Sequence, residues 1–501
     1  MQKIILTTLN SRYTHSAIGL RYLYANMQEL QDFTEIVEFS INDALQSVAE
    51  KILLHKPDIV GIGVYIWNAL EVAELLHILK KVAPEMIVVL GGPEVTHLPY
   101  RVPFDECDYI IQGEGDTAFY ALCKRIIEKN PPKEKIIPMS MPNLKELQLP
   151  YKYYSDHDIQ NRYIYVEISR GCPFECEFCL SSMDERVRAF NLDEVLEEFE
   201  KLWQKGARNY KFVDRTFNLN MKTANKILDF FLDKGDEEYF VHFEVIPDHF
   251  PHSLREKIQR FRAGALQLEI GIQTLNPKVA DNISRVLNME KLHDNITFLE
   301  IQTHAHIHLD LIVGLPGETL KSFGKNLDAL VALSSCEIQI GILKKLSGTH
   351  IERHDKEYAM VYSDKPPYDI LQNRDLSFLD IQIMKRFARF WDLLYNSGNF
   401  KNSLKLLYAG ESVYENFYAL SLWIYEQTQS TWKISLDRLG ALFFTYLTEQ
   451  KGVDAQSVAD EMLKDMLKLK GRAVPVYLKP YAKKTKVEAK EGRSGFNKRQ
   501  L

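Results

Sequence analysis

Short apolar segments alternate with amphipathic helical segments over residues 1–350, and this alternation limits the fold more than any other feature. Regular strand and helix alternation is typical of parallel sheets covered by helices on both faces. In the first part, strands are expected at 3–8, 35–40, 58–64, 86–90 and 109–111, with helices at 17–30, 43–55, 69–82 and 116–129. Residues 1–130 are therefore expected to form an α/β domain with a doubly wound parallel sheet.

A proline-rich segment separates this part from a second alternating stretch. Residues 131–160 contain Pro131, Pro132, Pro138, Pro142 and Pro150 and predict an extended linker. Beyond it, strands are expected at 163–169, 210–214, 239–245, 265–271, 306–312 and 337–340, with helices at 193–204, 223–233, 253–261, 277–283 and 319–332. Six such units, and not eight, predict a partial (β/α)6 barrel over residues 161–350.

The strands of this barrel have one apolar and one polar face. Residues such as Ile164, Leu268 and Leu309 fall on the apolar face, which helices must cover. The opposite set consists of Glu167, Ser169, Phe212, Asp214, His242, Glu244, Gln267, Glu269, Gln273, His306, His308, Asp310 and Gln339. A polar interior predicts a cavity that holds ligands, because a closed barrel normally fills its centre with branched apolar side chains.

Three of the six cysteines follow the first barrel strand as C-x-x-x-C-x-x-C, namely Cys172, Cys176 and Cys179. Thiolates bind iron and zinc, but a closed structural site takes four ligands. Three ligands leave one metal position open, which indicates a reactive centre; a zinc knuckle without its last ligand is the alternative. Cys107, Cys123 and Cys336 are scattered and are expected to be buried thiols.

This cysteine spacing, with Phe178 before the last cysteine, resembles the cluster loop of the radical SAM enzymes. The resemblance implies a [4Fe-4S] cluster on Cys172, Cys176 and Cys179, and S-adenosylmethionine (SAM) bound at the open iron. It also implies that a flavodoxin or ferredoxin acts as the reductant. The residues that it implies for SAM are Phe178, Asp214, Glu244, Glu269, Gln273, Arg285, Gly314 and Pro316.

Unusual residues also follow the strands of the first domain, where ligands of parallel sheets bind. They are Tyr13, His15, Tyr65, Trp67, Asn68, Gly91, Gly92, Pro93, Glu94, Gly113, Glu114 and Gly115. Together, and ahead of a cluster loop, they resemble the cobalamin-binding domain of B12-dependent radical SAM enzymes, which implies that they bind cobalamin. The D-x-H-x-x-G motif of methionine-synthase-like domains is missing around His15. Cobalamin without a histidine ligand, or no cobalamin at all, is therefore implied.

One strand carries His304, His306 and His308 in alternation. Imidazoles at this spacing can share a metal ion, but the sequence offers no adjacent carboxylate beyond Asp310. Contact with substrate or cofactor is the favoured role for His306 and His308, and a metal site is the alternative.

The last part of the chain is predicted to be helical at 370–396, 412–429, 435–449 and 454–469. Residues 351–480 resemble an accessory domain of unknown function in one subgroup of B12-dependent radical SAM proteins. Residues 481–501 form a basic tail, which is expected to be disordered, with an RNA contact as the alternative. No apolar run is long enough to cross a bilayer, no signal peptide pattern begins the chain, and a cytoplasmic protein is expected.

The combined prediction is a cobalamin-dependent radical SAM enzyme. Methyl transfer to an unactivated carbon of an unknown substrate is the outcome that the family most often implies. Radical rearrangement, cyclisation or oxidation without methyl transfer is one alternative, and a non-catalytic cobalamin or redox sensor is another. Methylthiotransferases are disfavoured, because they need three cysteines in the first domain and only Cys107 and Cys123 are present.

Overall fold

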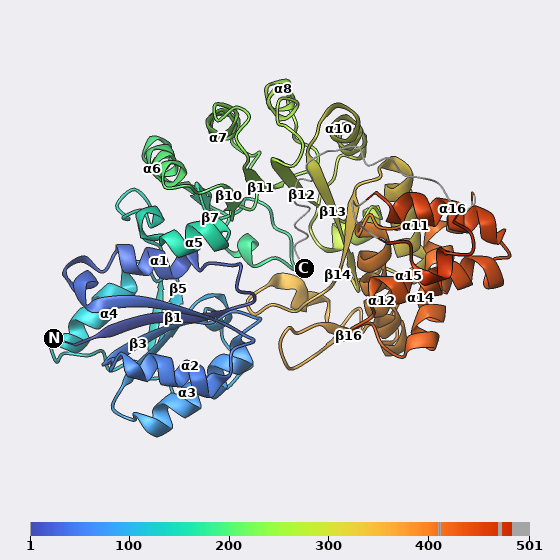
Figure 1. The fold of residues 1–501 in the computed structure, drawn as a ribbon. Helices are drawn as coiled ribbons and strands as arrows, with labels where there is room; N and C mark the ends of the chain where they lie inside the picture. Colours follow the sequence, from blue (N-terminus) through green and yellow to red (C-terminus); the bar gives the residue numbers. More distant parts are fainter. Residues whose placement is uncertain (1, 409, 411, 469–472, 483–501) are drawn as a thin grey trace.

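Two six-stranded parallel sheets form the first two thirds of the molecule, and helices dominate the rest (Figure 1). The computed structural model describes residues 2–408, 410, 412–468 and 473–482. In the first sheet the strand order is β2-β1-β3-β4-β5-β6. Its strands are β1 Ile4–Asn10, β2 Thr34–Ser40, β3 Ile59–Gly63, β4 Ile87–Gly91, β5 Tyr109–Gly113 and β6 Ile136–Ser140.

Helices cover both faces of this sheet because its central strands are apolar on both sides. They are α1 Ile18–Ala25, α2 Leu45–Leu54, α3 Ala69–Val82 and α4 Ala118–Ile127. Helices α2 and α3 pack on one face in a core that includes Val60 and Val88, and α1 and α4 pack on the other with Leu6. The predicted doubly wound α/β fold is confirmed.

The predicted extended linker is wrong for β6. This strand pairs in parallel with β5, Ile110 opposite Ile136, and extends the first sheet by one strand. Pro138 lies within it. Proline cannot donate a ladder hydrogen bond and is tolerated on an edge strand, which is the position that β6 takes. The short helix α5 Asp156–Asn161 then leads into the barrel.

The second sheet is an open barrel with strand order β14-β13-β12-β11-β10-β7. Its strands are β7 Ile164–Val166, β10 Asn209–Phe212, β11 Phe240–Val245, β12 Leu266–Gln273, β13 His306–Val313 and β14 Glu337–Ile342. Helices α6 Leu192–Gln204, α7 Met221–Leu232, α8 His252–Ile258, α10 Met289–Gln302 and α11 Leu320–Leu333 lie along its outer side (Figure 1). The predicted partial barrel of six strands is confirmed.

Two details of the barrel differ from the sequence prediction. The segment between β12 and β13 holds two helices, α9 Pro277–Asn282 and α10, and only the first was predicted. Phe212 was assigned to the interior face, but its ring packs outward among Phe199, Phe231 and Phe243. The strand β10 ends at Phe212, so the alternation that links Phe212 to Asp214 is broken there.

The C-terminal region begins with a hairpin of β15 Val361–Tyr362 and β16 Ile370–Gln372. Helices follow at α12 Phe378–Trp391, α13 Leu404–Tyr408, α14 Val413–Thr428, α15 Leu436–Thr445 and α16 Ala455–Met466. The helix predicted at 370–396 is therefore wrong at its start: Ser377 and Asp380 form a capping box there. Helix α13 was not predicted, and most of the basic tail lies outside the described residues.

Aromatic side chains of α14 belong to the core of the C-terminal region: the Phe417 ring packs edge-to-face against Phe387 and Trp391.

Among the described residues, no helix combines the length and the apolar character that crossing a lipid bilayer requires.

Candidate functional site

The cysteine loop, residues 169–189, begins and ends in a short antiparallel strand pair next to the barrel. It leaves through β8 Ser169–Arg170 and returns through β9 Arg188–Ala189, which pair antiparallel. Gly171 has a left-handed backbone, and a side chain there would strike the carbonyl of Arg186. Cys172 and Cys176 are buried, and Cys179 is half-buried. Burial raises the pKa of Cys172, and the nearby Cys179 and Cys176 raise it further.

The three thiols are the residues that could hold an iron cluster, and the described residues place no fourth cysteine with them. Cys107 and Cys123 lie in the two cores of the first domain, on opposite faces of its sheet. Cys336 stands at the start of β14 beside Ser334. Three soft ligands and one open position fit a [4Fe-4S] cluster that binds a further ligand, and they do not fit a closed structural zinc site.

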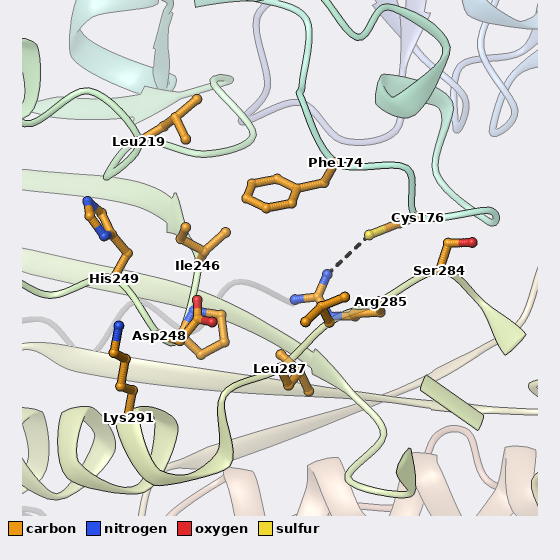
Figure 2. A pocket seen from close by; sticks show the side chains of 12 residues that line it. Phe174, Cys176, Leu219, Ile246, Asp248, His249, Ser284, Arg285, Leu287 and Lys291 are labelled. Carbon is orange, nitrogen blue, oxygen red and sulfur yellow. Dashed lines mark hydrogen bonds between the residues drawn. The ribbon is translucent and has the colours of Figure 1, made fainter. Parts of the chain in front are cut away.

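Arginine side chains surround these thiols. Arg285 reaches Cys176, with Nη1 to Sγ at 3.3 Å, and its Nη2 donates to the Gly271 carbonyl at the end of β12 (Figure 2). Arg215 is paired with Glu244 at 2.9 Å, and this carboxylate raises the pKa of the guanidinium. Fixed positive charge beside thiolates favours an anionic cluster and a carboxylate ligand.

A cavity of about 290 Å³ opens beside Cys176 and Arg285 (Figure 2). Phe174 and Arg285 lie on the side of the cavity that is near Cys176, and Asp248, His249 and Lys291 lie on the opposite side. Phe178, predicted to frame the adenine, is absent from this lining and packs partly buried against the barrel core. Phe174 was not singled out in the sequence.

Polar side chains fill the barrel interior as predicted. His242 and Glu269 are joined at 3.0 Å. Burial raises the pKa of Asp310, and Glu269 beside it raises this pKa further. Burial also lowers the pKa of His308 to about 4. Gln273 has a left-handed backbone at an irregularity in β12.

Asp214, assigned by resemblance to the SAM amino group, already holds protein donors. Its carboxylate accepts from the Ile168 N–H at 3.0 Å and from the Ser169 hydroxyl at 2.6 Å. Burial raises its pKa to about 7. In this structure Asp214 fixes the start of the cysteine loop.

The glycine turn after β13 is held by other parts of the chain. Gly314 has a left-handed backbone, and its carbonyl accepts from Asn373 at 3.2 Å. The Pro316 carbonyl accepts from Asn282 at 2.8 Å. This turn therefore connects α9 with the C-terminal region.

Glu177 is a site residue that the sequence analysis missed. Its buried carboxylate accepts from Ser284 at 2.7 Å and is paired with His354 at 2.9 Å and with Arg353. Its backbone carbonyl accepts from Ile351 N–H at 2.9 Å. An acidic residue between two of the predicted cluster cysteines, Cys176 and Cys179, was the available signal, because a carboxylate that is buried there needs a partner.

A second cavity, of about 210 Å³, lies at the carboxyl ends of β3, β4 and β5 and is called the glycine cavity below. Of the residues predicted for cobalamin, six line it: Tyr65, Gly91, Gly92, Gly113, Glu114 and Gly115. The other walls are mostly apolar and include Leu20, Leu23 and Phe119. A mostly apolar cavity that is walled in part by glycine backbone suits a flat aromatic ring on a bulky ligand.

The remaining predicted residues do not line this cavity. Asn68 accepts from Tyr65 N–H and donates to the Leu9 carbonyl, which ties β1 to β3. Trp67 is exposed and stacks on Tyr65, with ring centroids 4.5 Å apart. Pro93 starts a short 3-10 helix, and Glu94 is buried against the Tyr368 hydroxyl.

His15 and Tyr13 face the barrel. His15 Nδ1 contacts the Tyr165 hydroxyl, and burial, aided by Lys211 and Arg12, lowers its pKa to about 4. The Tyr13 hydroxyl contacts His157. Neither side chain lies in the lining of the glycine cavity.

Arg170 links the cysteine loop to the glycine cavity. This residue precedes Gly171 and lines the glycine cavity. Its guanidinium pairs with Glu114 and Asp116 of the first domain, each at 2.8 Å, and with Glu167 of the barrel at 2.8 Å. It also lies over the rings of Tyr22 and Phe190. A rigid ion pair network thus joins the cysteine loop to the carboxyl end of the first sheet.

Three family models match the chain. They are described as B12 binding domain over residues 4–123, Radical SAM superfamily over residues 166–330, and Protein of unknown function (DUF4080) over residues 356–499. The first covers β1 to β5 of the first sheet, and the second covers β10 to β13 of the second sheet together with the cysteine loop. The third covers the helical C-terminal region.

Several curated proteins are similar to the chain. An uncharacterized methyltransferase, PH0819, of Pyrococcus horikoshii is 26% identical over 63% of this chain and 74% of its own length. The 2-(S-pantetheinyl)-carbapenam-3-carboxylate methyltransferase of Streptantibioticus cattleyicolor is 23% identical, over 61% of this chain and 49% of its own. The cobalamin-dependent radical SAM methyltransferase TokK of Streptomyces tokunonensis is also 23% identical, over 65% and 53%. The chain thus spans about half of the last two proteins.

Two solved structures share the fold. The cobalamin-dependent S-adenosylmethionine radical enzyme OxsB, with aqua-cobalamin and SAM bound, aligns with a TM-score of 0.62 over 93% of this chain and 79% of its own, at 13% identity. The methyltransferase TsrM of Kitasatospora setae, with cobalamin and a [4Fe-4S] cluster, aligns with a TM-score of 0.56 over 73% and 78%, at 16% identity. The chain thus combines, in this order, a B12-binding domain, a radical SAM domain and a DUF4080 region, and it shares its fold with cobalamin-dependent radical SAM enzymes.

Proposed function

We propose that this chain is a cobalamin-dependent radical SAM methyltransferase that methylates an unactivated carbon atom. The observation that carries the proposal is the Arg170 network, which holds the cysteine loop and the glycine cavity against each other. Chemistry that uses two cofactors in one reaction requires their sites to adjoin, and a separate sensor domain would not. The similar proteins named as methyltransferases support the type of reaction.

In this proposal Cys172, Cys176 and Cys179 hold the cluster, and Arg285 and the cavity beside Cys176 receive SAM. The glycine cavity, with Tyr65 and Gly92 in its wall, receives the aromatic tail of cobalamin. When bound, the cluster supplies the electron that cleaves a carbon–sulfur bond of SAM, and cobalamin supplies a methyl carrier. The protein residues position these groups, neutralise charge and exclude water.

The substrate is proposed to occupy the polar interior of the barrel, near Glu269, His242 and Asp310. Buried carboxylates and an imidazole suit a substrate with hydrogen-bond donors or a positive charge. The external electron donor is proposed to be a flavodoxin or ferredoxin. Its contact must come close to the cysteine loop, where Phe174 and Glu175 are exposed.

The test is anaerobic reconstitution with iron, sulfide and hydroxocobalamin, followed by SAM and dithionite. We expect a bound cluster, bound cobalamin and the release of both 5'-deoxyadenosine and S-adenosylhomocysteine. Cys176→Ala should abolish the cluster and SAM cleavage, whereas Cys336→Ala, a half-buried cysteine outside the loop, should retain both. A full iron complement in Cys176→Ala would contradict the assignment of the loop.

A second candidate is a radical reaction without methyl transfer. It is favoured by OxsB, which aligns over 93% of the chain and is described as a radical enzyme. The same assay separates the two candidates. Release of 5'-deoxyadenosine with no S-adenosylhomocysteine, in the presence of bound cobalamin, would support the second.

A further inference from the structure

Two imidazoles and one carboxylate meet at the end of the barrel that lies away from the cysteine loop. His306 and His308 are the first and third residues of β13, so their side chains share a face. Glu337 is the first residue of β14 and lies directly opposite His308 in the parallel register. The Gly314 turn follows the other end of β13, roughly 25 Å along the strand from His306 at about 3.3 Å per residue.

The spacing of these atoms suits a metal ion. Glu337 places one carboxylate oxygen 3.2 Å from Nε2 of His306 and the other 3.3 Å from Nε2 of His308. One ligand atom from each of the three residues lies within 4.8 Å of the other two. Tetrahedral bonds of about 2.0–2.1 Å place neighbouring ligand atoms roughly 3.3 Å apart.

A second layer of side chains orients the buried imidazole. His308 Nδ1 faces the amides of Gln267, at 3.2 Å, and Gln339. In both contacts the amide nitrogen faces Nδ1; a half-turn of either amide brings its oxygen to an Nδ1–H group, which leaves the lone pair of Nε2 directed at Glu337 and His306. Histidines that bind metals commonly have such a partner on the second nitrogen.

We propose that His306, His308 and Glu337 bind a divalent transition metal ion, Zn²⁺ or Fe²⁺. Two imidazoles and one carboxylate are the protein ligands of catalytic zinc and non-haem iron sites, which keep a position open. The His306 side chain is 49% exposed, so water or a donor group of a ligand can reach that position. Because β14 is an edge strand of the sheet, the ion also clamps this edge to β13.

The test removes the competing cysteines first. Full-length chain with Cys172→Ser, Cys176→Ser and Cys179→Ser is stripped with EDTA and titrated with Zn²⁺ against a chromophoric chelator, and separately with Fe²⁺ under anaerobic conditions. We expect one equivalent of bound metal and a rise in the unfolding temperature. Co²⁺ in place of Zn²⁺ should give visible bands without the thiolate charge-transfer band in the near ultraviolet.

Glu337→Gln and His306→Gln should each weaken binding roughly 100-fold and remove the thermal shift. His304→Gln, an exposed histidine two residues before the site, is the matched control and should leave both unchanged. Circular dichroism of the metal-free variants checks their folding. Binding weaker than millimolar in the chain with the three cysteine substitutions would overturn the proposal, and so would binding that Glu337→Gln and His306→Gln leave intact.

Discussion

Glu177 is the residue through which the short helix His350–His354, between β14 and the C-terminal hairpin, holds the cysteine loop. Its carboxylate is buried and receives Ser284, His354 and Arg353 from two separate segments. Unpaired buried charge is costly, so these contacts fix the backbone between Cys176 and Cys179. The short helix His350–His354, which lies just before the residues that match DUF4080, thereby contributes directly to the geometry of the cysteine loop.

Glu177→Gln is expected to loosen this loop, because the amide keeps one acceptor but loses both charged pairs. The free energy of unfolding should fall by roughly 2 kcal/mol, less than for a fully buried pair because Arg353 is largely exposed. Iron content after reconstitution should drop, and the electron paramagnetic resonance signal of the reduced cluster should broaden. Glu175→Gln, the same change at an exposed position in the loop, is the control. Equal effects of the two substitutions would contradict the role of Glu177.

At the scale of single elements, α4 can pack closely on β3 because Gly61 has no side chain. A Cβ atom there would lie 2.8 Å from two ring atoms of Phe119 and 3.1 Å from Leu6. Both glycine and ring also line the glycine cavity. Packing and ligand binding in the first domain therefore depend on the same contact.

Gly61→Ala is expected to destabilise the first domain by about 2 kcal/mol, which lowers its unfolding temperature by roughly 4–8 °C. It should also weaken the binding of hydroxocobalamin, measured by absorption titration. Gly91 lines the same cavity, and a Cβ atom there would have its nearest neighbour at 3.8 Å. Gly91→Ala should therefore weaken cobalamin binding without lowering the unfolding temperature. Gly341→Ala, in the barrel, should do neither. Unchanged cobalamin affinity in both cavity variants would show that the cofactor binds elsewhere.

Most elements of the two sheets are predictable because buried parallel strands produce apolar runs of recognisable length. The strand β6 was missed because Pro138 suggests a linker, and only its position at the sheet edge explains the proline. The helix at 370–396 was misplaced because β16 and α12 are both apolar and nearly adjacent. The cap at Ser377 marks the boundary between them.

In the candidate site, too, some features could be predicted from the sequence and others could not. The carboxyl ends of strands could be identified from the order of the elements, which is why six predicted residues line one cavity. Partners far apart in the sequence could not be identified. Glu94 meets Tyr368, Glu177 meets His354, and Asp214 meets Ser169, so charged residues that look like ligand contacts in the sequence serve partly as structural ties.

At the scale of the whole molecule, the first domain is held from two sides. The Arg170 network binds it to the barrel, and Arg101 and Glu94 bind it to the C-terminal hairpin through Tyr368 and the Lys345 carbonyl. Arg101 also lies over the Tyr368 ring, 4.5 Å from its centroid. This arrangement fixes the distance between the glycine cavity and the cysteine loop.

Arg170→Met is expected to uncouple these two sites, because it leaves the buried Glu167 and Asp116 without their cation. The cost is roughly 3–5 kcal/mol. Hydrogen exchange should speed up in the segment around Asp116 and in the β8–β9 hairpin, while the cores of β3 and β12 stay protected. In the reconstituted enzyme, SAM cleavage to 5'-deoxyadenosine should survive better than formation of S-adenosylhomocysteine, because only the second product depends on both cofactors. Arg208→Met removes an arginine that pairs with Glu237 within the barrel and should change neither the exchange of these segments nor the product ratio. If Arg170→Met lowered both products equally while exchange stayed at the wild-type rate, the network would act on the cysteine loop alone, and the alignment of the two cofactor sites would rest on the Glu94 and Arg101 contacts.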